Sequence, residues 1–498
     1  MKFEVCIPIT APTLEKAIDE LKEAEKFVDL IELRMDYIKN IDKNKLKKLL
    51  EKRNKKVIVT CRPKSLCGNF NGNEEDRINL LKKAVEFNAE FIDIEIEVGK
   101  EKILELIKNK KNSNVIVSCH NQKETLPLNE LQKKYEEIKK LSPDLIKIAA
   151  NANSINDNFT IFELLKGKKN LIAFCMGIRG QISRILAPKY GSRMTFASLK
   201  EGKESASGQI SIEEMKNVYN IDLINKDTQP IGVIGSLAEN SMSKYMHNPS
   251  FKAKKLNFAY IPFKVREGEL EEFISNFRKF DFKGSSVTVP HKVEVIKYID
   301  KVDKTAKQIG AVNAIVNDNG RLIGYNTDYY GAAKALKEKT ALKGKKILVI
   351  GAGGASRAVI YALKNEQSDI TLINRTGEKA KELALEFEVQ FAEFKDKKAL
   401  IRNNDIIINT TSVGMKPNIN ESIINEDELA EGKAIMDIVY KPAETKLIKM
   451  ARKKRCEVIT GDKMLAYQAI GQYKLWTKQE PDFKLMEKSL LEQIRKGG

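Results

Sequence analysis

Short apolar segments recur through residues 1–219, and each is followed by a longer amphipathic stretch. Segments that are apolar along their whole length are typical of strands covered on both faces, and their alternation with helical stretches indicates a parallel α/β fold. The segments are 3–9, 30–35, 57–61, 91–96, 115–119, 145–149, 171–176 and 194–198. Eight such strands within about 220 residues predict a (βα)8, or TIM, barrel.

The pattern changes between residues 223 and 230, where a polar stretch ends in a proline and a new apolar strand begins at 231. A chain of 498 residues also exceeds what one core supports, because domains usually contain roughly 100–250 residues. The expected domains are a barrel formed by residues 1–222, a smaller α/β domain formed by 230–327 together with 462–498, and a Rossmann-type nucleotide-binding domain formed by 328–461.

The composition is that of a globular protein. Its hydrophobic fraction of 42% is ordinary, and no apolar run approaches the ~20 residues that span a bilayer. The first residues read as a buried strand rather than as a targeting segment, so we expect a cytoplasmic protein with no membrane partner. Six cysteines without paired spacing indicate reduced core residues, and they predict neither disulfides nor a metal site.

A net charge of +19 leaves a nucleic-acid partner open as an alternative. The lysines, however, are spread along amphipathic helices, as in 44–49, and are not gathered with aromatic side chains. We therefore interpret the charge as a solvated, lysine-rich surface that attracts anionic substrates, and we expect no nucleic-acid partner.

Polar side chains stand where several barrel strands end, on the face where (βα)8 enzymes place their active sites. They include Glu32, Arg34, Arg62 and His120. Lys147 lies inside the apolar strand 145–149, where burial disfavours the ammonium ion and makes the neutral amine available to attack a carbonyl. A nearby histidine then carries protons. Taken alone, Lys147 also reads as a salt-bridged structural lysine, and His120 as a ligand, a base or a core residue.

Five segments together resemble type I 3-dehydroquinate dehydratases, and the resemblance covers residues 1–219. They are 32–36, 117–121, 146–149, 176–184 and 205–209. The resemblance implies that Lys147 forms an imine with the ketone of 3-dehydroquinate. It implies that His120 removes the C2 proton and assists loss of the C1 hydroxyl as water, while Arg184 clamps the substrate carboxylate. The other implied substrate contacts are Glu32, Arg34 and Arg62, with Ser205 and Gln209 on a loop that closes over the site.

One position departs from this family. Its members usually follow the arginine of the third strand with a Glu-Gly-Gly segment, but residues 62–68 put Leu66 where the glutamate belongs. The family's glutamate helps to position the histidine, so its loss is expected to slow the first activity or to shift its optimum pH. The imine-forming lysine and the proton carrier are retained.

A strand, a glycine turn and a helix start follow one another from residue 346 to 358, which suits a pyrophosphate at a helix N-terminus. The fingerprint comprises Gly351, Gly353, Gly354 and Ala355, with Ser356 in place of its third glycine. After the next strand, where an NAD site carries an acidic residue, stand Asn374, Arg375, Thr376 and, close behind, Lys379. Cationic groups there favour the 2′-phosphate of NADP; a basic loop without a ligand is the alternative.

Three further segments, 285–292, 310–314 and 324–328, resemble shikimate dehydrogenases, and this resemblance extends over residues 229–488. It implies that Lys292 and Asp328 form the catalytic pair that carries the proton accompanying hydride transfer. The implied substrate contacts are Ser241, Ser243, Thr288, Asn313, Tyr440 and Gln468. Thr410 and Gly461 complete the implied cofactor contacts.

Two positions depart from this second family. The serines Ser241 and Ser243 stand in a segment that otherwise differs from the family's His-Ser-Lys-Ser-Pro. Lys463 replaces a glycine, and its side chain either crowds the nicotinamide or points to solvent. His247 and His291 have no second histidine or cysteine at ligand spacing, so we interpret both as structural.

The whole chain thus resembles a fusion of the two enzymes. It predicts a bifunctional shikimate-pathway enzyme that dehydrates 3-dehydroquinate and reduces the product, 3-dehydroshikimate, to shikimate with NADPH and without a metal. Quinate oxidation is one alternative for the second half, although retention of both serines favours shikimate, which lacks quinate's C1 hydroxyl. A basic scaffold with a degenerate first site is another, and retention of Lys147, His120 and Arg184 argues against it.

Overall fold

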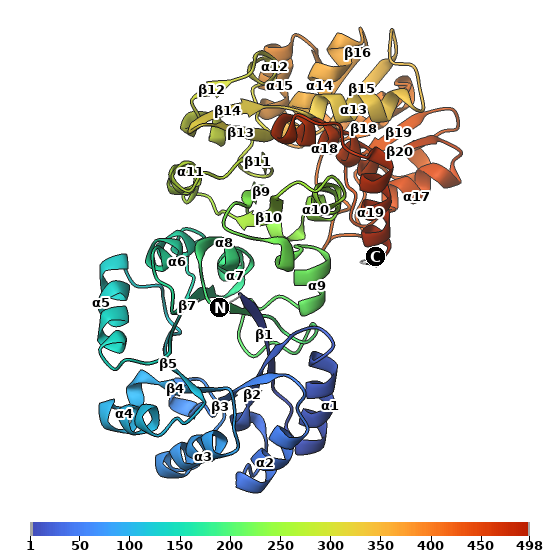
Figure 1. Cartoon of the computed structure of the whole chain (residues 1–498). Helices are drawn as coiled ribbons and strands as arrows, with labels where there is room; N and C mark the ends of the chain where they lie inside the picture. The colour runs from blue at the N-terminus through green and yellow to red at the C-terminus, as the bar shows by residue number, and fades with distance from the viewer. Residues whose placement is uncertain (1–2, 497–498) are drawn as a thin grey trace. The chain divides into compact units, whose positions relative to one another are not determined.

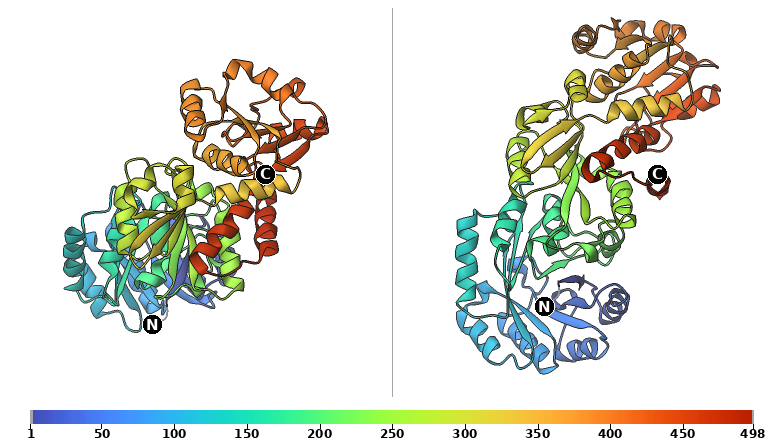
Figure 2. Two further views of the ribbon diagram at one scale, coloured as in Figure 1. Left: turned by 90° about the horizontal axis from the view of Figure 1, so that it is seen from above. Right: turned by 45° about the horizontal axis from the view of Figure 1, so that its top comes forward.

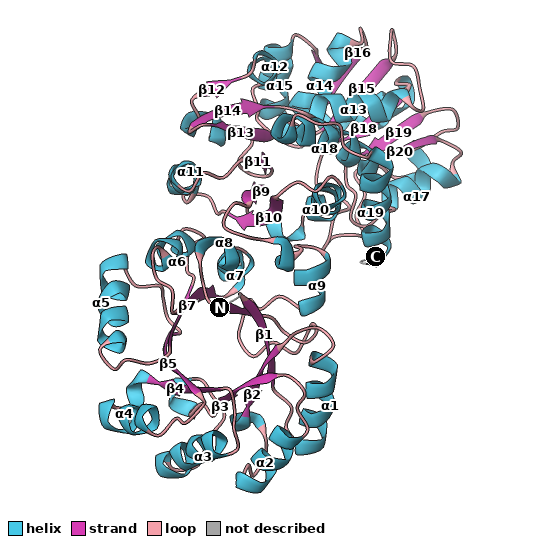
Figure 3. Ribbon diagram, viewed as in Figure 1, coloured by secondary structure: helices cyan, strands magenta, loops and turns pink. Residues whose placement is uncertain are grey.

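The computed structural model describes residues 3–496 and divides the chain into two compact units, Met1–Thr228 and Gln229–Gly498. The first unit contains one eight-stranded sheet and the second contains two six-stranded sheets, drawn in magenta in Figure 3. The boundary lies in the polar stretch 223–230, where Asn225 and Thr228 close a turn through two hydrogen bonds of 2.9 and 3.0 Å.

The strands of the first unit are all parallel, and Figure 1 shows them as a ring with helices outside. They are β1 (Glu4–Ile9), β2 (Leu30–Arg34), β3 (Lys56–Thr60), β4 (Phe91–Glu95), β5 (Asn114–Asn121), β6 (Leu145–Asn151), β7 (Leu171–Met176) and β8 (Met194–Phe196). β1 pairs with both β2 and β8. Among the described residues no ladder joins β7 to β8, but the Arg193 N–H donates to the Leu171 carbonyl over 2.9 Å. The predicted (βα)8 barrel is confirmed as a nearly closed barrel.

The helices of this unit bury one apolar stripe and expose their lysines. They are α1 (Leu14–Ala24), α2 (Lys43–Glu51), α3 (Glu74–Glu86), α4 (Lys100–Lys108), α5 (Leu128–Lys139), α6 (Asp157–Leu165), α7 (Gln181–Ile185), α8 (Ala187–Tyr190) and α9 (Ile212–Asn217). In α2 the Asp42 carboxylate caps the first turn by accepting from two backbone N–H groups, and Leu46, Leu49 and Leu50 face the core. The lysines between these leucines are solvated, which accounts for part of the positive charge.

The first sheet of the second unit is mixed, and the second sheet is entirely parallel. The mixed sheet contains β9 (Gln229–Gly235), β10 (Phe258–Lys264), β11 (Gly284–Val287), β12 (Lys301–Val302), β13 (Ala314–Asp318) and β14 (Arg321–Tyr325). The parallel sheet contains β15 (Lys346–Ile350), β16 (Asp369–Ile373), β17 (Gln390–Phe391), β18 (Ile406–Asn409), β19 (Ala434–Asp437) and β20 (Glu457–Thr460). Its order, β17-β16-β15-β18-β19-β20, is that of Rossmann-type sheets, which bind ligands where the order reverses, beyond β15 and β18.

One helix near the end of the chain joins the cores of both sheets. The helices are α10 (Ser243–Ala253), α11 (Leu270–Lys279), α12 (Lys304–Ile309), α13 (Asp328–Lys337), α14 (Gly354–Asn365), α15 (Gly377–Phe387), α16 (Lys397–Asn403), α17 (Lys446–Lys453), α18 (Gly461–Thr477) and α19 (Phe483–Lys496). Figure 2 shows α13 and α18 side by side. Met464 of α18 packs in the core of the parallel sheet, whereas Trp476 packs in that of the mixed sheet. Within residues 3–496, no helix combines the length and apolarity needed to cross a membrane.

Candidate active sites

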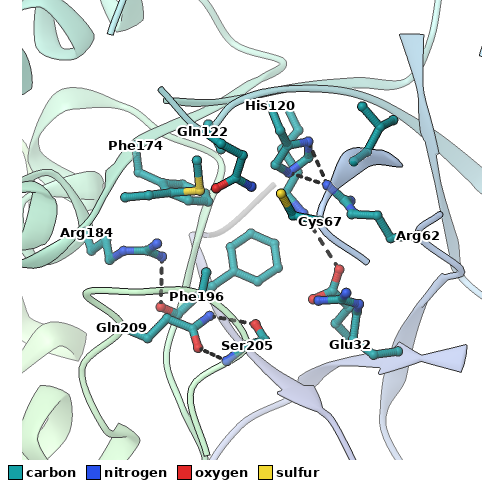
Figure 4. A pocket seen from close by; sticks show the side chains of 16 residues that line it. Glu32, Arg62, Cys67, His120, Gln122, Phe174, Arg184, Phe196, Ser205 and Gln209 are labelled. Atoms are coloured by element: carbon teal, nitrogen blue, oxygen red, sulfur yellow. Dashed lines mark hydrogen bonds and ion pairs between the residues drawn. The ribbon is translucent and has the colours of Figure 1, made fainter. Parts of the chain in front are cut away.

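A cavity of about 60 Å³ opens at the carboxyl ends of the barrel strands. Its lining includes all eight residues expected at the first site, which Figure 4 shows as sticks. They are Glu32, Arg34, Arg62, His120, Lys147, Arg184, Ser205 and Gln209. Strand ends distant in sequence meet here because a closed parallel barrel directs all its carboxyl ends to one face.

Lys147, on β6, is buried but does not lie in an apolar environment. Its Nζ lies 3.0 Å from Asp93 Oδ2 and 3.7 Å from Glu32 Oε1, and 4.2 Å above the Phe196 ring. This corrects the expected surroundings, because two buried carboxylates face the amine. Burial by itself would raise the pKa of Asp93, but Lys147 and Arg62 outweigh burial and hold that pKa well below its usual range. An amine attacks a carbonyl in its neutral form, so the reaction needs a base near the lysine.

His120, at the end of β5, is such a base. Arg62 Nη1 lies 2.7 and 2.6 Å from its two ring nitrogens, as Figure 4 shows. Desolvation and the cationic groups of Arg62 and Lys147 hold the pKa of His120 well below its usual value. The ring is therefore neutral near neutral pH and is able to accept a proton. Leu66 lines the same cavity, so no carboxylate from that position opposes the cations.

A buried chain of ion pairs holds Arg62 in place. Arg62 Nη2 lies 3.2 Å from Asp93, and its Nε lies 3.6 Å from Glu95 Oε1. The other oxygen of Glu95 lies 2.7 Å from Arg77 Nη1, which reaches in from α3. Sequence reasoning assigned no role to Asp93 or Arg77. The two carboxylates could have been recognised as site residues from the sequence, because they stand at the carboxyl end of a barrel strand. An arginine within a helix carries no such signal.

Arg184, on α7, is fully buried without a counter-ion. Its Nη1 donates to the Phe196 carbonyl over 3.4 Å, and its Nε and Nη2 have no hydrogen-bond partner among the described residues. Burial lowers the pKa of its guanidinium to about 10. Burying a cation whose N–H donors have no partner costs free energy unless an anion pairs with it. This corner of the cavity therefore fits the carboxylate of a ligand. Arg34, by contrast, already forms a bidentate pair with Asp36, at 2.8 and 2.9 Å.

Ser205 and Gln209 lie together on the loop between β8 and α9. The Gln209 side chain accepts from the Ser205 N–H over 2.8 Å and donates to the Ser205 hydroxyl over 3.1 Å. These two bonds join the two residues within one loop. The residues expected to form a lid therefore lie together beside the cavity.

The expected catalytic pair of the second unit is formed. Lys292 Nζ lies 2.6 Å from Asp328 Oδ2, and Asn313 Nδ2 donates to Asp328 Oδ1 over 2.7 Å. Thr327 fixes the Asn313 amide, because its N–H donates to Asn313 Oδ1 over 2.7 Å. Gln468, from α18, lies 3.4 Å from the same amide nitrogen. Lys292 and Gln468, separated by 176 positions, thus belong to one group of contacts around Asp328 and Asn313.

The two expected serines lie at the start of α10. The Ser243 N–H donates to the Ser241 hydroxyl over 3.2 Å, and the Ser243 hydroxyl is hydrogen-bonded to Tyr260. Tyr260 is 2.7 Å from the Ser286 hydroxyl, which donates to Gln472 over 2.6 Å. Gln472 in turn donates to the Asn313 carbonyl over 3.0 Å. This buried relay, not expected from sequence, connects the serines with the catalytic pair.

Two other expected substrate contacts are also near these residues. Tyr440 packs against the apolar cluster that includes Met242 and Ala466, so it lies between the serine segment and α18. Thr288 follows β11, and its N–H donates to the Ile234 carbonyl over 2.9 Å. Lys463 forms an ion pair that the sequence did not indicate. Its ammonium lies 2.5 Å from Glu487 of α19, and its side chain is partly exposed.

The glycine turn after β15 has the geometry that a pyrophosphate needs. Gly351 has φ of 119°, which favours glycine, and a side chain there would meet the Thr410 hydroxyl at 2.6 Å. A side chain at Gly353 would meet nothing within 4 Å, so open space lies beside the first turn of α14. Ser356 stands at the third glycine position, and its side chain is bonded within the protein. Its hydroxyl lies 2.7 Å from the Thr410 hydroxyl and accepts from the Gly353 N–H over 3.1 Å.

The remaining expected cofactor contacts fall into three places. Gly354 and Ala355 form the first turn of α14, and Gly354 packs against the Lys292 side chain. Arg375, Thr376 and Lys379 are exposed beyond β16, beside Asn374, whose amide donates to the Thr376 carbonyl over 3.0 Å. Gly461 has no room for a side chain, because a Cβ would stand 2.3 Å from the Ile438 carbonyl oxygen.

The two histidines interpreted as structural, His291 and His247, have different surroundings. His291 is buried, and its Nε2 lies 2.9 Å from the Val265 carbonyl. His247 is buried, and neither of its ring nitrogens has a hydrogen-bond partner within residues 3–496; it stacks on Tyr260, and burial lowers its pKa to about 3. All six cysteines are free. The described part of the chain contains no cluster of His, Cys, Asp and Glu suited to a metal ion.

Fold and sites define a two-site α/β enzyme, with a lysine–histidine cavity in a barrel and a lysine–aspartate pair beside a Rossmann-type domain. Comparison with known families agrees. "Type I 3-dehydroquinase" matches residues 5–226, "Shikimate dehydrogenase substrate binding domain" matches 233–315, "Shikimate / quinate 5-dehydrogenase" matches 333–440, and "Shikimate 5'-dehydrogenase C-terminal domain" matches 463–491.

Individual relatives agree with these matches. The chloroplastic bifunctional 3-dehydroquinate dehydratase/shikimate dehydrogenase of Arabidopsis thaliana is 34% identical over 495 residues, covering 95% of this chain and 82% of its own. The NADP(+) shikimate dehydrogenase of Methanocaldococcus jannaschii is 42% identical over 283 residues, covering 55% and 100%. A solved shikimate dehydrogenase in complex with NADP+ has a TM-score of 0.52 and 41% identity, covering 54% and 97%.

The chain belongs to the family of bifunctional 3-dehydroquinate dehydratase/shikimate dehydrogenases. It is a bifunctional shikimate-pathway enzyme, with a dehydratase half and a shikimate dehydrogenase half. The quinate alternative for the second half is not favoured.

Proposed function

We propose that the first site dehydrates 3-dehydroquinate through an imine on Lys147. The observation that carries this proposal is the placement of three groups on one cavity: the Lys147 amine, the neutral His120 ring and the unpaired Arg184 guanidinium. Arg184 binds the substrate carboxylate through its unused Nε and Nη2 donors. This contact orients the ketone toward Lys147 and the C2 hydrogen toward His120.

His120 serves in two successive proton transfers. Lys147, after losing a proton, attacks the ketone carbon, and loss of water leaves a protonated imine that withdraws electrons from C2. His120 accepts the C2 proton, giving an enamine, and then donates that proton to the C1 hydroxyl, which departs as water. Hydrolysis of the imine releases 3-dehydroshikimate and restores the amine. Glu32, Arg34 and Arg62 hold the substrate hydroxyls, while the loop of Ser205 and Gln209 covers the site.

In the second site we propose that Lys292 donates the proton and that Asp328 orients it. The carbonyl oxygen of 3-dehydroshikimate accepts the proton as the carbonyl carbon accepts hydride, which NADPH supplies when bound. Asp328 and Asn313 also bind substrate hydroxyls, Ser241 and Ser243 bind its carboxylate, and Thr288, Tyr440 and Gln468 complete the pocket. The support is the 2.6 Å contact between Lys292 and Asp328, adjacent to Gly354 of the cofactor turn.

We propose NADP as the cofactor. The residues present fit it: Gly353 leaves open space for a pyrophosphate, and Arg375 and Lys379 are exposed where an NAD site carries an acid. Asn374 and Thr376 would contact the 2′-phosphate beside Arg375. Gly351, Gly354, Ala355, Thr410 and Gly461 shape the rest of the cofactor crevice. A cytoplasmic location and the absence of a nucleic-acid partner stay predictions from the sequence pattern.

Borohydride trapping tests the first proposal. Treatment with 3-dehydroquinate and borohydride should reduce the imine to a stable secondary amine, and peptide mass mapping should place the added mass on Lys147. Lys147→Ala should lose both the adduct and dehydratase activity while it oxidises shikimate normally, which shows that the chain still folds. An adduct on another lysine, or dehydratase activity in Lys147→Ala, contradicts the assignment.

A further inference from the structure

Asp437 is a buried carboxylate to which the reaction described above gives no role. It ends β19, at the carboxyl edge of the Rossmann-type sheet, and has no exposed surface. It accepts three hydrogen bonds and forms no ion pair with any described residue. Asn409 Nδ2 lies 3.0 Å from Oδ1, the Val439 N–H lies 3.1 Å from Oδ1, and the Thr445 hydroxyl lies 2.6 Å from Oδ2.

The three donors belong to three different segments. Asn409 ends β18, and its side-chain oxygen accepts from both the N–H and the hydroxyl of Thr411, at 3.0 and 2.7 Å, so it fixes the loop that begins at Thr410. Val439 belongs to the segment that carries Tyr440. Thr445 caps the first turn of α17, where its hydroxyl accepts from the Ile448 N–H over 3.3 Å. Asp437 is thus bonded to all three segments.

The polarity of the two bonds to Oδ1 is fixed. The Val439 N–H is only a donor, and the Asn409 amide must direct its nitrogen to Asp437 because Thr411 occupies its oxygen. The Thr445 hydroxyl accepts from Ile448 and has a second lone pair, so it can either donate to Oδ2 or accept a proton from it. Oδ1 therefore bridges Asn409 and Val439 in both protonation states of Asp437.

We propose that Asp437 is a positioning residue of the second site, whose Oδ1 holds the cofactor-side loop through Asn409 and the Tyr440 segment through Val439. The inference rests on the proposed function, since that function places Thr410 at the cofactor and Tyr440 at the substrate. Asp437 itself touches neither. It sets the separation of two loops that enclose the crevice beyond β15 and β18, where Rossmann-type domains bind their ligand.

The same contacts hold the two loops in either protonation state of Asp437. Burial raises the pKa of Asp437 to about 6, and the bonds from Thr445, Val439 and Asn409 only partly oppose burial. No charged side chain faces it from the packed elements: β18 offers an amide, the 438–442 segment a backbone N–H, α17 a hydroxyl, and β20 pairs through Thr460. Glu431 and Glu444, the nearest acids in sequence on either side, pair with Arg455 and Arg452 instead. A proton taken up on Oδ2 meets the Thr445 oxygen, so protonation leaves both bonds to Oδ1 in place.

Asp437→Ala tests this, because it removes the oxygen that bridges Asn409 and Val439. We expect KM for NADP and for shikimate to rise at least about fivefold while kcat changes less than about twofold. Asp437→Asn is the matched control; its oxygen takes the place of Oδ1 and its nitrogen donates to the Thr445 hydroxyl, so both KM values should stay unchanged. Thr445→Val removes only the bond to α17 and should also leave both KM values unchanged.

Asn409→Ala should reproduce the rise in KM for NADP. The Asp437→Ala/Asn409→Ala double variant should have the KM values of Asp437→Ala, because Asp437→Ala already removes the bond that Asn409→Ala removes. Dehydratase activity, measured in the same samples, reports that the chain is folded. If Asp437→Ala lowers the unfolding temperature but moves neither KM, the role is structural and the proposal is wrong. If wild type fails to oxidise shikimate with NADP, the proposed function fails instead, and calorimetric NADP binding to the same variants still tests the inference.

Discussion

Leu66→Glu should restore to the first site a carboxylate that its family usually has. In the structure His120 faces Arg62 at 2.6 Å and shares a cavity with Lys147, and the pKa of the ring lies well below its usual value. Leu66 lines the same cavity. An opposite charge within hydrogen-bonding distance or slightly beyond raises the pKa of an imidazole by about 1–3 units.

The consequence for catalysis follows from the role of His120 as a base. A base whose pKa is far below the assay pH holds its proton weakly, so bringing the pKa closer to the assay pH strengthens proton abstraction. A rise of about 2 units should increase dehydratase kcat about tenfold near neutral pH. The acid limb of the pH profile, where protonation of His120 removes the base, should move upward by about 1–3 units.

The assay follows dehydratase turnover against pH in wild type, Leu66→Glu and Leu66→Gln. The glutamine variant matches the size and polarity of glutamate without its charge, so it should leave the acid limb where wild type has it. Shikimate oxidation should be equal in all three, because its residues belong to the second unit. Identical pH profiles for Leu66→Glu and Leu66→Gln would refute the electrostatic argument.

Three other substitutions separate the two sites. Lys292→Ala should lower shikimate oxidation at least about 100-fold and leave dehydration unchanged, as two activity assays on one sample would show. Arg375→Ala should reduce the preference for NADP over NAD about tenfold or more, measured as the ratio of the two kcat/KM values. Arg184→Met should abolish dehydratase activity yet raise the free energy of unfolding by on the order of 1–3 kcal/mol, because it removes a buried charge that has no partner; denaturant titration measures the gain.

The sequence determined the two folds and most of the residues that line the sites. Strand and helix periodicities are local, so the eight barrel strands and the glycine turn could be recognised from neighbouring residues alone. Lys147 stood out because a lysine is unusual inside an apolar strand. The Lys292–Asp328 pair was implied by short segments that resemble a known family, and the structure brings the two side chains to 2.6 Å.

Only the tertiary structure decided what surrounds those residues. Lys147 and Asp93 are 54 positions apart, and the closure of the barrel, not any local pattern, brings them to 3.0 Å. The same holds for Arg77, which supports the site from a helix, and for Lys463, which pairs with Glu487 of the following helix. The charge state of a buried group depends on every partner that packing supplies, and packing couples segments whose order along the chain does not reveal their distance.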